Sequence, residues 1–291
     1  MSKLYDKMLT QLQLSGYKER TCKSYLKAVQ QLHRFCNKPL SQIRQSDVRD
    51  YWLACKNDYG WSPATLRISY SGIKFFFSRT LVRKWKLLDE VRFERERSLP
   101  TVLSMAEVQH ILRALPTLQS KAFYVTLYTL GLRLLECISL EVRDIDGERG
   151  VVHIRGGKGA CDRIIPLPNI TRQFLRAYYK THQNPRYIFP AIGHNQWHLS
   201  GSAKTTVSKS AIQRVLGRTV DKLGVKKHVH PHVFRHSYAT HLLEANVPIH
   251  HVQKLLGHKA LQSTIIYLHV TTIAETHSHE RVCQVVQGAL S

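Results

Sequence analysis

Residues 151–167 read VVHIRGGKGACDRIIPL, and this stretch decides the fold class of the second half of the chain. Short β-rich runs at 151–154 and 163–167 flank a glycine-rich tip that carries Lys158. Two such runs around a glycine-containing loop predict a β-hairpin. Apolar residues return to helical spacing on both sides, so we expect a small antiparallel sheet within a mainly helical, α+β domain.

Helical patterns lie on both sides of this hairpin. Ser104 and Glu107 have the S-x-x-E spacing of a capping box just before apolar positions, so a helix and a new domain are expected to begin there. The next apolar pattern holds Phe123 and Leu127 and runs into Arg133, which we therefore place inside a helix. Further helices are expected around residues 171–179, 208–223, 233–244 and 248–256.

The beginning of the chain predicts a smaller unit of four amphipathic helices. Apolar residues recur at helical spacing within residues 5–12 and 25–35. We expect Ser46 to cap a third helix and Ser62 to cap a fourth, in which Pro63 occupies the first turn. The fold class is therefore mainly α, with a four-helix amino-terminal domain preceding the α+β domain.

A charged segment separates these two domains. Residues 92–97 read RFERER and lack an apolar rhythm, which is typical of an exposed connection. We divide the chain into a helical domain at 1–90, a linker at 91–102 and a second domain at 103–291.

The charge balance points to a polyanionic partner. Lys and Arg number 43 against 20 Asp and Glu, which gives a formal net charge of +23 and argues against an ordinary neutral metabolic enzyme. Hydrophobic residues make up 43% of the chain, so a folded core carries this charge rather than a disordered tail. Residues 163–243 hold 13 Lys or Arg and a single acid, Asp221. This stretch is the expected nucleic-acid surface, although a solvated basic face fits the same pattern.

The sequence also predicts a cytoplasmic protein. Its first residues lack the apolar run of a signal peptide, and no stretch approaches the roughly 20 apolar residues of a membrane span. The six cysteines form no C-x-x-C pair, so we expect neither a zinc ribbon nor a disulfide framework.

Two short motifs could bind phosphate. His232 and Arg235 stand three apart at an expected helix start, where free backbone N–H groups favour anions, although a basic surface helix fits as well. His258 follows Gly257, which by itself reads as a helix C-cap. Tyr267 taken alone could equally be a core residue.

Arg133 and Lys158 also have two interpretations. A buried arginine three residues before Glu136 could be a structural ion pair, or Glu136 could orient the guanidinium toward a phosphate. Lys158 could be a simple turn residue or a mobile catalytic lysine.

In their order along the chain, these residues and the sequence motifs around them resemble the active-site set of the tyrosine recombinases, also called the phage-integrase family. The set is Arg133, Lys158, His232, Arg235, His258 and Tyr267. The surrounding motifs include TLGLR at 129–133, HVFRHSYATH at 232–241 and LLGHK at 255–259. The resemblance extends over essentially the whole chain, whose size is nearest to Xer-type and simple mobile-element recombinases. Leu130 and Phe234 depart from the usual residues but remain apolar.

The resemblance implies a site-specific DNA strand transferase that needs no cofactor and no metal. Tyr267 is then the nucleophile that forms a 3′-phosphotyrosyl link, and Arg133 and Arg235 stabilise the charge that develops on the phosphate oxygens. A partner strand's 5′ hydroxyl attacks this link, and exchange proceeds through a Holliday junction. The implied partners are double-stranded DNA and a homotetramer or mixed tetramer on synapsed sites.

The same resemblance assigns the remaining roles. Lys158 protonates the departing 5′ oxygen, His232 assists proton transfer at the tyrosine, and His258 hydrogen-bonds the phosphate. The amino-terminal helices correspond to a core DNA-binding domain that closes around the duplex with the catalytic domain.

Three alternatives remain open on the sequence alone. A type IB topoisomerase-like relaxing enzyme shares the phosphotyrosine chemistry, and a DNA-binding regulator without catalysis fits the charge. A metal site is the third alternative, because His228, His230 and His232 alternate along the chain.

Overall fold

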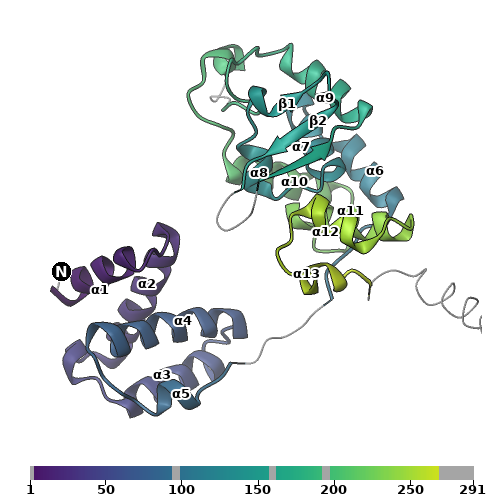
Figure 1. The fold of residues 1–291 in the computed structure, drawn as a ribbon. Coiled ribbons are helices and arrows are strands. Elements are labelled where there is room, and N and C mark those ends of the chain that lie inside the picture. Colours follow the sequence, from purple (N-terminus) through teal and green to yellow (C-terminus); the bar gives the residue numbers. More distant parts are fainter. Residues whose placement is uncertain (1–2, 94–98, 157–161, 192–196, 269–291) are drawn as a thin grey trace, which may run out of the picture. The chain divides into compact units, whose positions relative to one another are not determined.

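The structure is a computed structural model that describes residues 3–93, 99–156, 162–191 and 197–268. It divides into two compact units, Met1–Ser98 and Leu99–Ser291 (Figure 1). We call them the amino-terminal unit and, after the role that the sequence resemblance implies for it, the catalytic unit.

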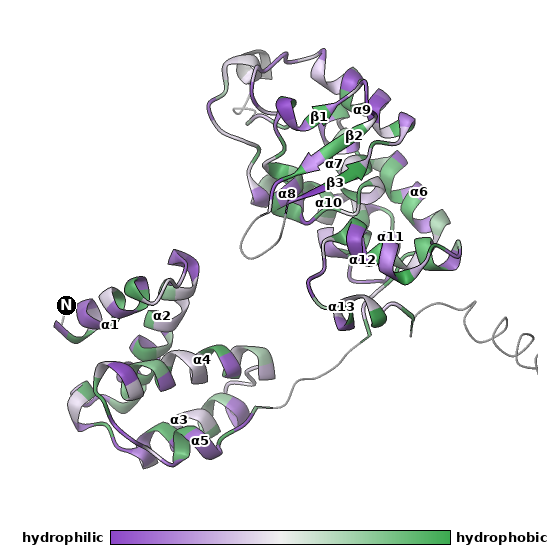
Figure 2. Ribbon diagram, in the orientation of Figure 1, coloured by the Kyte–Doolittle hydropathy of each residue, from purple (hydrophilic) through white to green (hydrophobic). Residues whose placement is uncertain are grey.

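The described part of the amino-terminal unit is helical throughout. Its elements are α1 (Lys3–Leu14), α2 (Glu19–Cys36), a 3-10 turn η1 (Leu40–Gln42), α3 (Gln45–Asn57), α4 (Pro63–Phe75), a π-helical turn η2 (Phe76–Thr80) and α5 (Leu87–Glu90). Figure 2 shows hydrophobic and hydrophilic residues along α1, α2 and α4, and each helix buries residues spaced about one turn apart, such as Met8 and Leu12 on α1. Helices α2 and α4 approach closely because Gly72 has no side chain: a Cβ there would lie 2.9 Å from Tyr25 Cα.

The predicted cap of the fourth helix, Ser62, is confirmed. The predicted cap of the third helix, Ser46, is wrong. Ser62 Oγ accepts from Thr65 N at 3.3 Å, and Pro63 lies in the first turn of α4. Helix α3 begins at Gln45, so Ser46 lies inside it; instead the Asp47 carboxylate accepts from Arg44 N at 2.8 Å. An aspartate in the first turn satisfies the free N–H group and favours the helix dipole, which makes a serine cap unnecessary.

Helices and a small sheet form the catalytic unit. Its elements are α6 (Met105–Ala114), α7 (Leu118–Thr129), α8 (Leu134–Ile138), a 3-10 turn η3 (Val142–Asp144), β1 (Ile145–Asp146), β2 (Val151–Ile154), β3 (Arg163–Pro166), α9 (Asn169–Tyr179), a 3-10 turn η4 (Trp197–Ser202), α10 (Lys209–Lys222), α11 (Pro231–Glu244), α12 (Ile249–Leu256) and α13 (Gln262–Ile265). Among the described residues, the strands pair antiparallel in the order β1-β2-β3, with Val152 opposite Ile165. The predicted hairpin and its small antiparallel sheet are confirmed, and β1 is an addition.

Helix α7 lies at the centre of this unit. Apolar and aromatic residues on all sides of it are buried, including Phe123, Tyr124 and Leu127, and it packs against α9 and α11. Buried Tyr124 satisfies its hydroxyl by donating to Ile212 O at 3.0 Å. The capping box predicted at the start of α6 is present: Ser104 N donates to Glu107, and Ser104 Oγ accepts from Glu107 N.

The expectation that Arg133 lies inside a helix is wrong. Helix α7 ends at Thr129, and Gly131 takes a left-handed conformation with φ +56°. A Cβ at Gly131 would lie 2.5 Å from the Tyr238 ring, so only glycine fits this turn. The turn makes Arg133 the N-cap of the next helix, α8, where its guanidinium donates to Glu136 in the first turn at 2.7 Å.

Within the described residues, Cys22, Cys36, Cys55 and Cys137 are free thiols, and no helix is long and apolar enough to cross a membrane.

Candidate active site

Four of the six residues predicted for the site lie together in the catalytic unit. Arg235 and Arg133 donate to the consecutive carbonyls of Leu256 and Gly257, the next residue is His258, and the ring of His258 stacks beside Tyr267, on which the charges of both arginines act. His232 stands close enough to both arginines for their charges to act on it. Lys158 lies outside the described residues.

One carboxylate organises the arginines. Glu136 is buried, and its two oxygens accept from Arg133 N at 2.9 Å, Arg133 Nη1 at 2.7 Å and both terminal nitrogens of Arg163 at 2.8 and 3.1 Å. Burial acts to raise the pKa of Glu136, but the hydrogen bonds and charges of Arg163 and Arg133 outweigh it and lower the pKa to about 2. Glu136 is therefore ionised at neutral pH, and both interpretations of the pair with Arg133 are compatible with it.

The last turn of α12 holds the same arginines from the other side. Three successive carbonyl oxygens accept from three different guanidinium groups: Leu255 O from Arg163 at 2.9 Å, Leu256 O from Arg235 at 2.6 Å and Gly257 O from Arg133 at 3.3 Å. Carbonyls at a helix C-terminus lack partners within the helix and carry partial negative charge, so cations stabilise them.

Arg235 is the most deeply buried of these three arginines. Its second nitrogen donates to Gly131 O at 2.6 Å, and its side chain lies 3.9 Å from Glu136. Burial and the charge of Arg133 lower the pKa of Arg235 to about 10. The positive charge of Arg235 is buried, and the one carboxylate near it also pairs with Arg133 and Arg163. The positive charge therefore exceeds the negative charge at this point, which favours the binding of an anion.

The left-handed Gly257 ends α12 and delivers His258 to this cluster. A Cβ at Gly257 would lie 3.0 Å from Arg163 Cδ, so the close approach of the arginine needs glycine. His258 Nδ1 is hydrogen-bonded to Thr264 Oγ1 at 2.8 Å. Burial and the charges of Arg235, Arg133 and Arg163 lower the pKa of His258 to about 4, which keeps it neutral at physiological pH.

Tyr267 follows the short helix α13 and is 2% exposed. Its ring lies 6.2 Å from that of His258, with an angle of 21° between the planes. Its hydroxyl is hydrogen-bonded to His236 Nδ1 at 3.0 Å. Burial raises the pKa of Tyr267, while Arg235 and Arg133 act to lower it, and the balance leaves the phenol protonated at neutral pH.

His232 lies at the start of α11 and is exposed. Desolvation by the surrounding protein, together with the charges of His230, Arg235 and Arg133, lowers its pKa. The rings of His228, His230 and His232 are spaced 5.6 and 6.2 Å apart in succession. In the part of the chain that the structure describes, no group of three His, Cys, Asp or Glu residues is placed to hold a metal ion.

A basic groove opens beside the cluster. A cavity of about 900 Å³ extends past Arg163 and His258, between the strands β2 and β3 and helix α12. Its basic lining residues are Arg143, His153, Arg155, Arg163, His250, Lys254, His258 and Lys259, and its acidic ones are Asp144 and Asp162.

Sequence reasoning missed three residues of this site: Arg163, His236 and Thr264. The sequence does hold a signal for Arg163, because an arginine at the start of an apolar strand must either be exposed to solvent or be paired with an acid. Leu130 and Phe234, the two departures from the usual pattern, are buried packing residues as expected.

The fold and the site together define a class of protein. Arg133, Arg163 and Arg235 share the single carboxylate of Glu136, so the cluster keeps an excess of positive charge next to a protonated phenol. Fixed guanidinium groups of this kind bind oxyanions and stabilise the charge that develops on them. The class is that of proteins that can bind an oxyanion beside a tyrosine hydroxyl.

Comparison with known proteins agrees with that class. Residues 101–273 match the model of the phage integrase family, and residues 4–87 match that of the phage integrase N-terminal SAM-like domain. A tyrosine recombinase of Thermosipho africanus is 33% identical over 87% of this chain and 90% of its own length. The tyrosine recombinase XerA of Pyrococcus horikoshii is 30% identical over 93% of this chain and 90% of its own length.

Solved structures agree with the fold. The Tn1549 transposon integrase in complex with transposon right end DNA has a TM-score of 0.72 at 20% identity, covering 97% of this chain and 100% of that chain. A lambda integrase tetramer bound to a Holliday junction has a TM-score of 0.73 at 17% identity, covering 90% of this chain and 76% of that chain. The chain belongs to the phage integrase family, and it is a tyrosine-type site-specific recombinase.

Proposed function

We propose that this recombinase cleaves and rejoins DNA strands through a 3′-phosphotyrosyl intermediate on Tyr267 and exchanges them through a Holliday junction. The observation that carries the proposal is the grouping of Arg133 and Arg235 on the last turn of α12 with His258, which follows that turn and stacks on Tyr267 at 6.2 Å. A phosphate bound by those guanidinium groups would present its phosphorus to the phenol. The energy of the broken phosphodiester is kept in the new ester, so the reaction needs no ATP.

Each step follows from the charges of the site. As Tyr267 Oη bonds to phosphorus, negative charge grows on the non-bridging oxygens, and Arg133 and Arg235 stabilise it without moving. In the tautomer in which His258 Nδ1 accepts from Thr264 Oγ1, a neutral His258 carries its proton on Nε2 and can donate it to a phosphate oxygen. We assign to Lys158 the proton that the departing 5′ oxygen needs, as the family resemblance implies.

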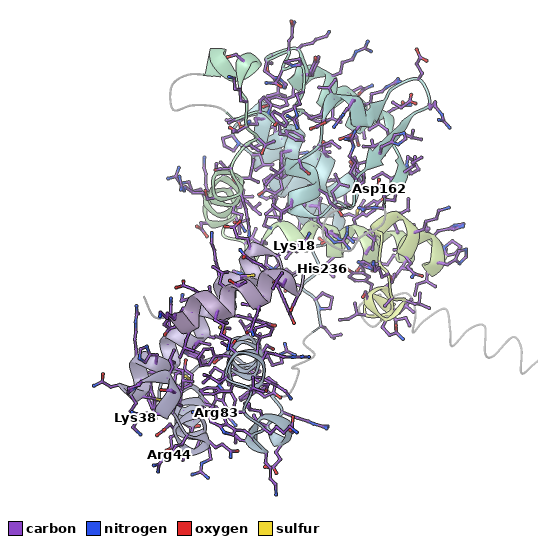
Figure 3. The ribbon with its side chains drawn as sticks, turned by 60° about the vertical axis from the view of Figure 1, so that its left-hand side comes forward. Lys18, Lys38, Arg44, Arg83, Asp162 and His236 are labelled. Atoms are coloured by element: carbon purple, nitrogen blue, oxygen red, sulfur yellow. The ribbon has the colours of Figure 1, made fainter. Side chains whose placement is uncertain are left out.

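Both units contribute to binding double-stranded DNA in this proposal. Lys and Arg number 20 against 9 acids in Met1–Ser98, and 23 against 11 in the remainder, so neither unit alone accounts for the net charge. Figure 3 labels four basic side chains of the amino-terminal unit: Lys18, Lys38, Arg44 and Arg83. The assembly we propose is a homotetramer or mixed tetramer on two synapsed sites, by similarity to the lambda integrase tetramer on a Holliday junction.

The test is to trap the covalent complex. A library of nicked duplexes made from the DNA that flanks the gene is incubated with the protein, and the strand attached to it is sequenced. We expect one or a few short sites, each joined through its 3′ phosphate, and no adduct with Tyr267→Phe. An adduct that persists in Tyr267→Phe would contradict the assignment of the nucleophile. Relaxation of any supercoiled plasmid without site preference would favour the topoisomerase-like alternative.

A further inference from the structure

The hydroxyl of Tyr267 has a histidine neighbour other than His232, the residue to which the family resemblance gives a role at the tyrosine proton. Among the described contacts, the Tyr267 hydroxyl has its hydrogen bond with His236 Nδ1, at 3.0 Å. His236 lies on α11 directly after Arg235, in the catalytic unit (Figure 3). His232, which the resemblance connected with the tyrosine proton, is exposed one turn earlier on the same helix.

The protonation states of the pair fit transfer from tyrosine to histidine. Burial lowers the pKa of His236 to about 4, and the charges of His232, His230 and Arg235 act in the same direction. The imidazole is therefore neutral at physiological pH. The protonated phenol of Tyr267 donates to Nδ1 in the tautomer of His236 that carries its ring proton on Nε2, and this is the tautomer that the proposal uses. A neutral imidazole at 3.0 Å from a nucleophile's hydroxyl has the geometry of a general base.

We propose that His236 is a catalytic residue that accepts the Tyr267 proton during strand cleavage; this inference rests on the proposed function. The Oη–H bond breaks as the Nδ1–H bond forms, and the electron pair left on Oη forms the Oη–P bond. The P–O5′ bond breaks at the same time, and the departing oxygen takes its proton from the general acid, which we assigned to Lys158. In rejoining, His236 returns the proton to Tyr267 as the Oη–P bond breaks.

A bound phosphate would make His236 a stronger base. Without DNA, the described groups that face His236 are cationic or neutral: His230 at the N-cap of its helix, His232 and Arg235 on the helix, and His258 and Tyr267 from the segments packed against it. A phosphate that acquires a second negative charge during the reaction favours the imidazolium and so raises the pKa of His236. The tyrosine thus stays protonated and unreactive until a phosphate occupies the site.

The chain provides a matched control on the same helix. His241 Nδ1 is hydrogen-bonded to the Tyr128 hydroxyl at 2.8 Å, and burial lowers the pKa of His241 as well. Its tyrosine has no part in the proposed reaction. Replacing either histidine by asparagine retains a short hydrogen-bonding side chain near the position of Nδ1 but removes a group that can take up a proton. A purely structural effect of breaking a His–Tyr pair would therefore be present in both variants.

The experiment measures single-turnover formation of the covalent adduct by the full-length protein on the site found by trapping. Wild type, His236→Asn, His241→Asn and Tyr267→Phe are compared from about pH 5.5 to pH 9, the range in which a histidine base and a tyrosine differ. Each is tested on a normal duplex and on one with sulfur in place of the bridging 5′ oxygen, because a thiolate leaves without needing a proton. Thermal unfolding and DNA binding check that each variant is folded.

We expect His236→Asn to cleave about 100-fold more slowly at pH 7, at the lower end of the usual contribution of a general base. Its rate should rise about tenfold per pH unit, because the phenolate must form beforehand, whereas the wild-type rate is nearly flat. Sulfur should not rescue it, and His241→Asn should behave like wild type.

A His236→Asn protein with the wild-type rate and pH profile would overturn the role of His236 and leave the proposed function intact. Rescue of that variant by sulfur would also overturn it, since the defect would then lie in the leaving group. If the wild type forms no adduct, or Tyr267→Phe still forms one, both the proposed function and this inference fail.

Discussion

Replacing Glu136 by glutamine should destabilise the catalytic unit strongly, because this one carboxylate compensates Arg133, Arg163 and, at 3.9 Å, Arg235. Its pKa falls from an ordinary 4.5 to about 2 in the folded protein. At about 1.4 kcal/mol per pKa unit, this shift corresponds to about 3 kcal/mol of stability at neutral pH. The glutamine amide also turns N–H groups toward Arg163, which leaves donors facing donors, and the loss of one partner of a buried pair typically costs about 3–5 kcal/mol. We therefore expect the free energy of unfolding to fall by at least about 3 kcal/mol.

The sign of the pH dependence follows from the lowered pKa. A carboxyl group whose pKa is lower in the folded state binds fewer protons there, so its stabilising effect is complete above its unfolded pKa of about 4.5. The effect is lost as the pH falls from there toward about 2, the pKa in the folded protein. The difference in stability between wild type and Glu136→Gln should therefore be constant near neutrality and should shrink in this acidic range.

Urea denaturation followed by circular dichroism measures this difference, and tryptophan fluorescence separates the units. Three of the four tryptophans, Trp52, Trp61 and Trp85, lie in the amino-terminal unit, so the fluorescence transition should barely move. Glu107→Gln is the control: Glu107 pairs with Lys227 at the surface, and such exposed pairs contribute about 1 kcal/mol or less. Equal losses in the two variants, or a Glu136→Gln difference that does not change between neutral and acidic pH, would refute the reasoning.

Three further predictions concern the turns and imidazoles of the site. Gly131→Ala should lose about 3 kcal/mol in urea denaturation, because alanine is strained at φ +56° and its Cβ would clash with the Tyr238 ring. Thr264→Val should slow adduct formation about tenfold while DNA affinity stays constant, since it frees the His258 ring without removing its donor, whose outright loss would cost about a hundredfold. His236 and His258 have pKa values of about 4 in the folded protein, below the ordinary value of about 6.5, so the unfolded chain binds more protons between these pH values. The free energy of unfolding should therefore fall as the pH drops from about 6.5 toward 4. His258→Asn should make that fall shallower in thermal unfolding.

Local sequence signals predicted most of the secondary structure. The capping box of Ser104 and Glu107, the cap at Ser62 and the β-rich runs that form β2 and β3 all act within a few residues, and the structure has each of them. These features depend on neighbouring backbone groups, so the sequence contains nearly all the information needed.

Features that depend on distant parts of the chain could not be predicted in the same way. The apolar pattern of α7 continues past Thr129, but the Tyr238 ring leaves room only for a left-handed Gly131, and the helix ends there. The two residues of β1 are too few for a β pattern to be recognised. The contact between His236 and Tyr267 joins residues 31 apart, and no local pattern indicates which histidine of α11 faces the tyrosine.

The last turn of α12 links the position of the cations to that of the nucleophile. The carbonyls of Leu255, Leu256 and Gly257 each hold one arginine, and the chain leaves this turn through His258 toward Tyr267. Each arginine is also held by a second contact: Arg133 and Arg163 donate to Glu136, and Arg235 donates to Gly131 O. A shift of the last turn of α12 would therefore displace the arginines and Tyr267 together. In the motif LLGHK at 255–259, the backbone carbonyls of the first three residues therefore contribute to the site as much as the histidine side chain does. A larger residue at Gly257 would be strained at φ +63° and would crowd the side chain of Arg163, whose Cδ lies 3.0 Å from the Cβ position, so adduct formation should fall even though no proposed catalytic side chain is changed.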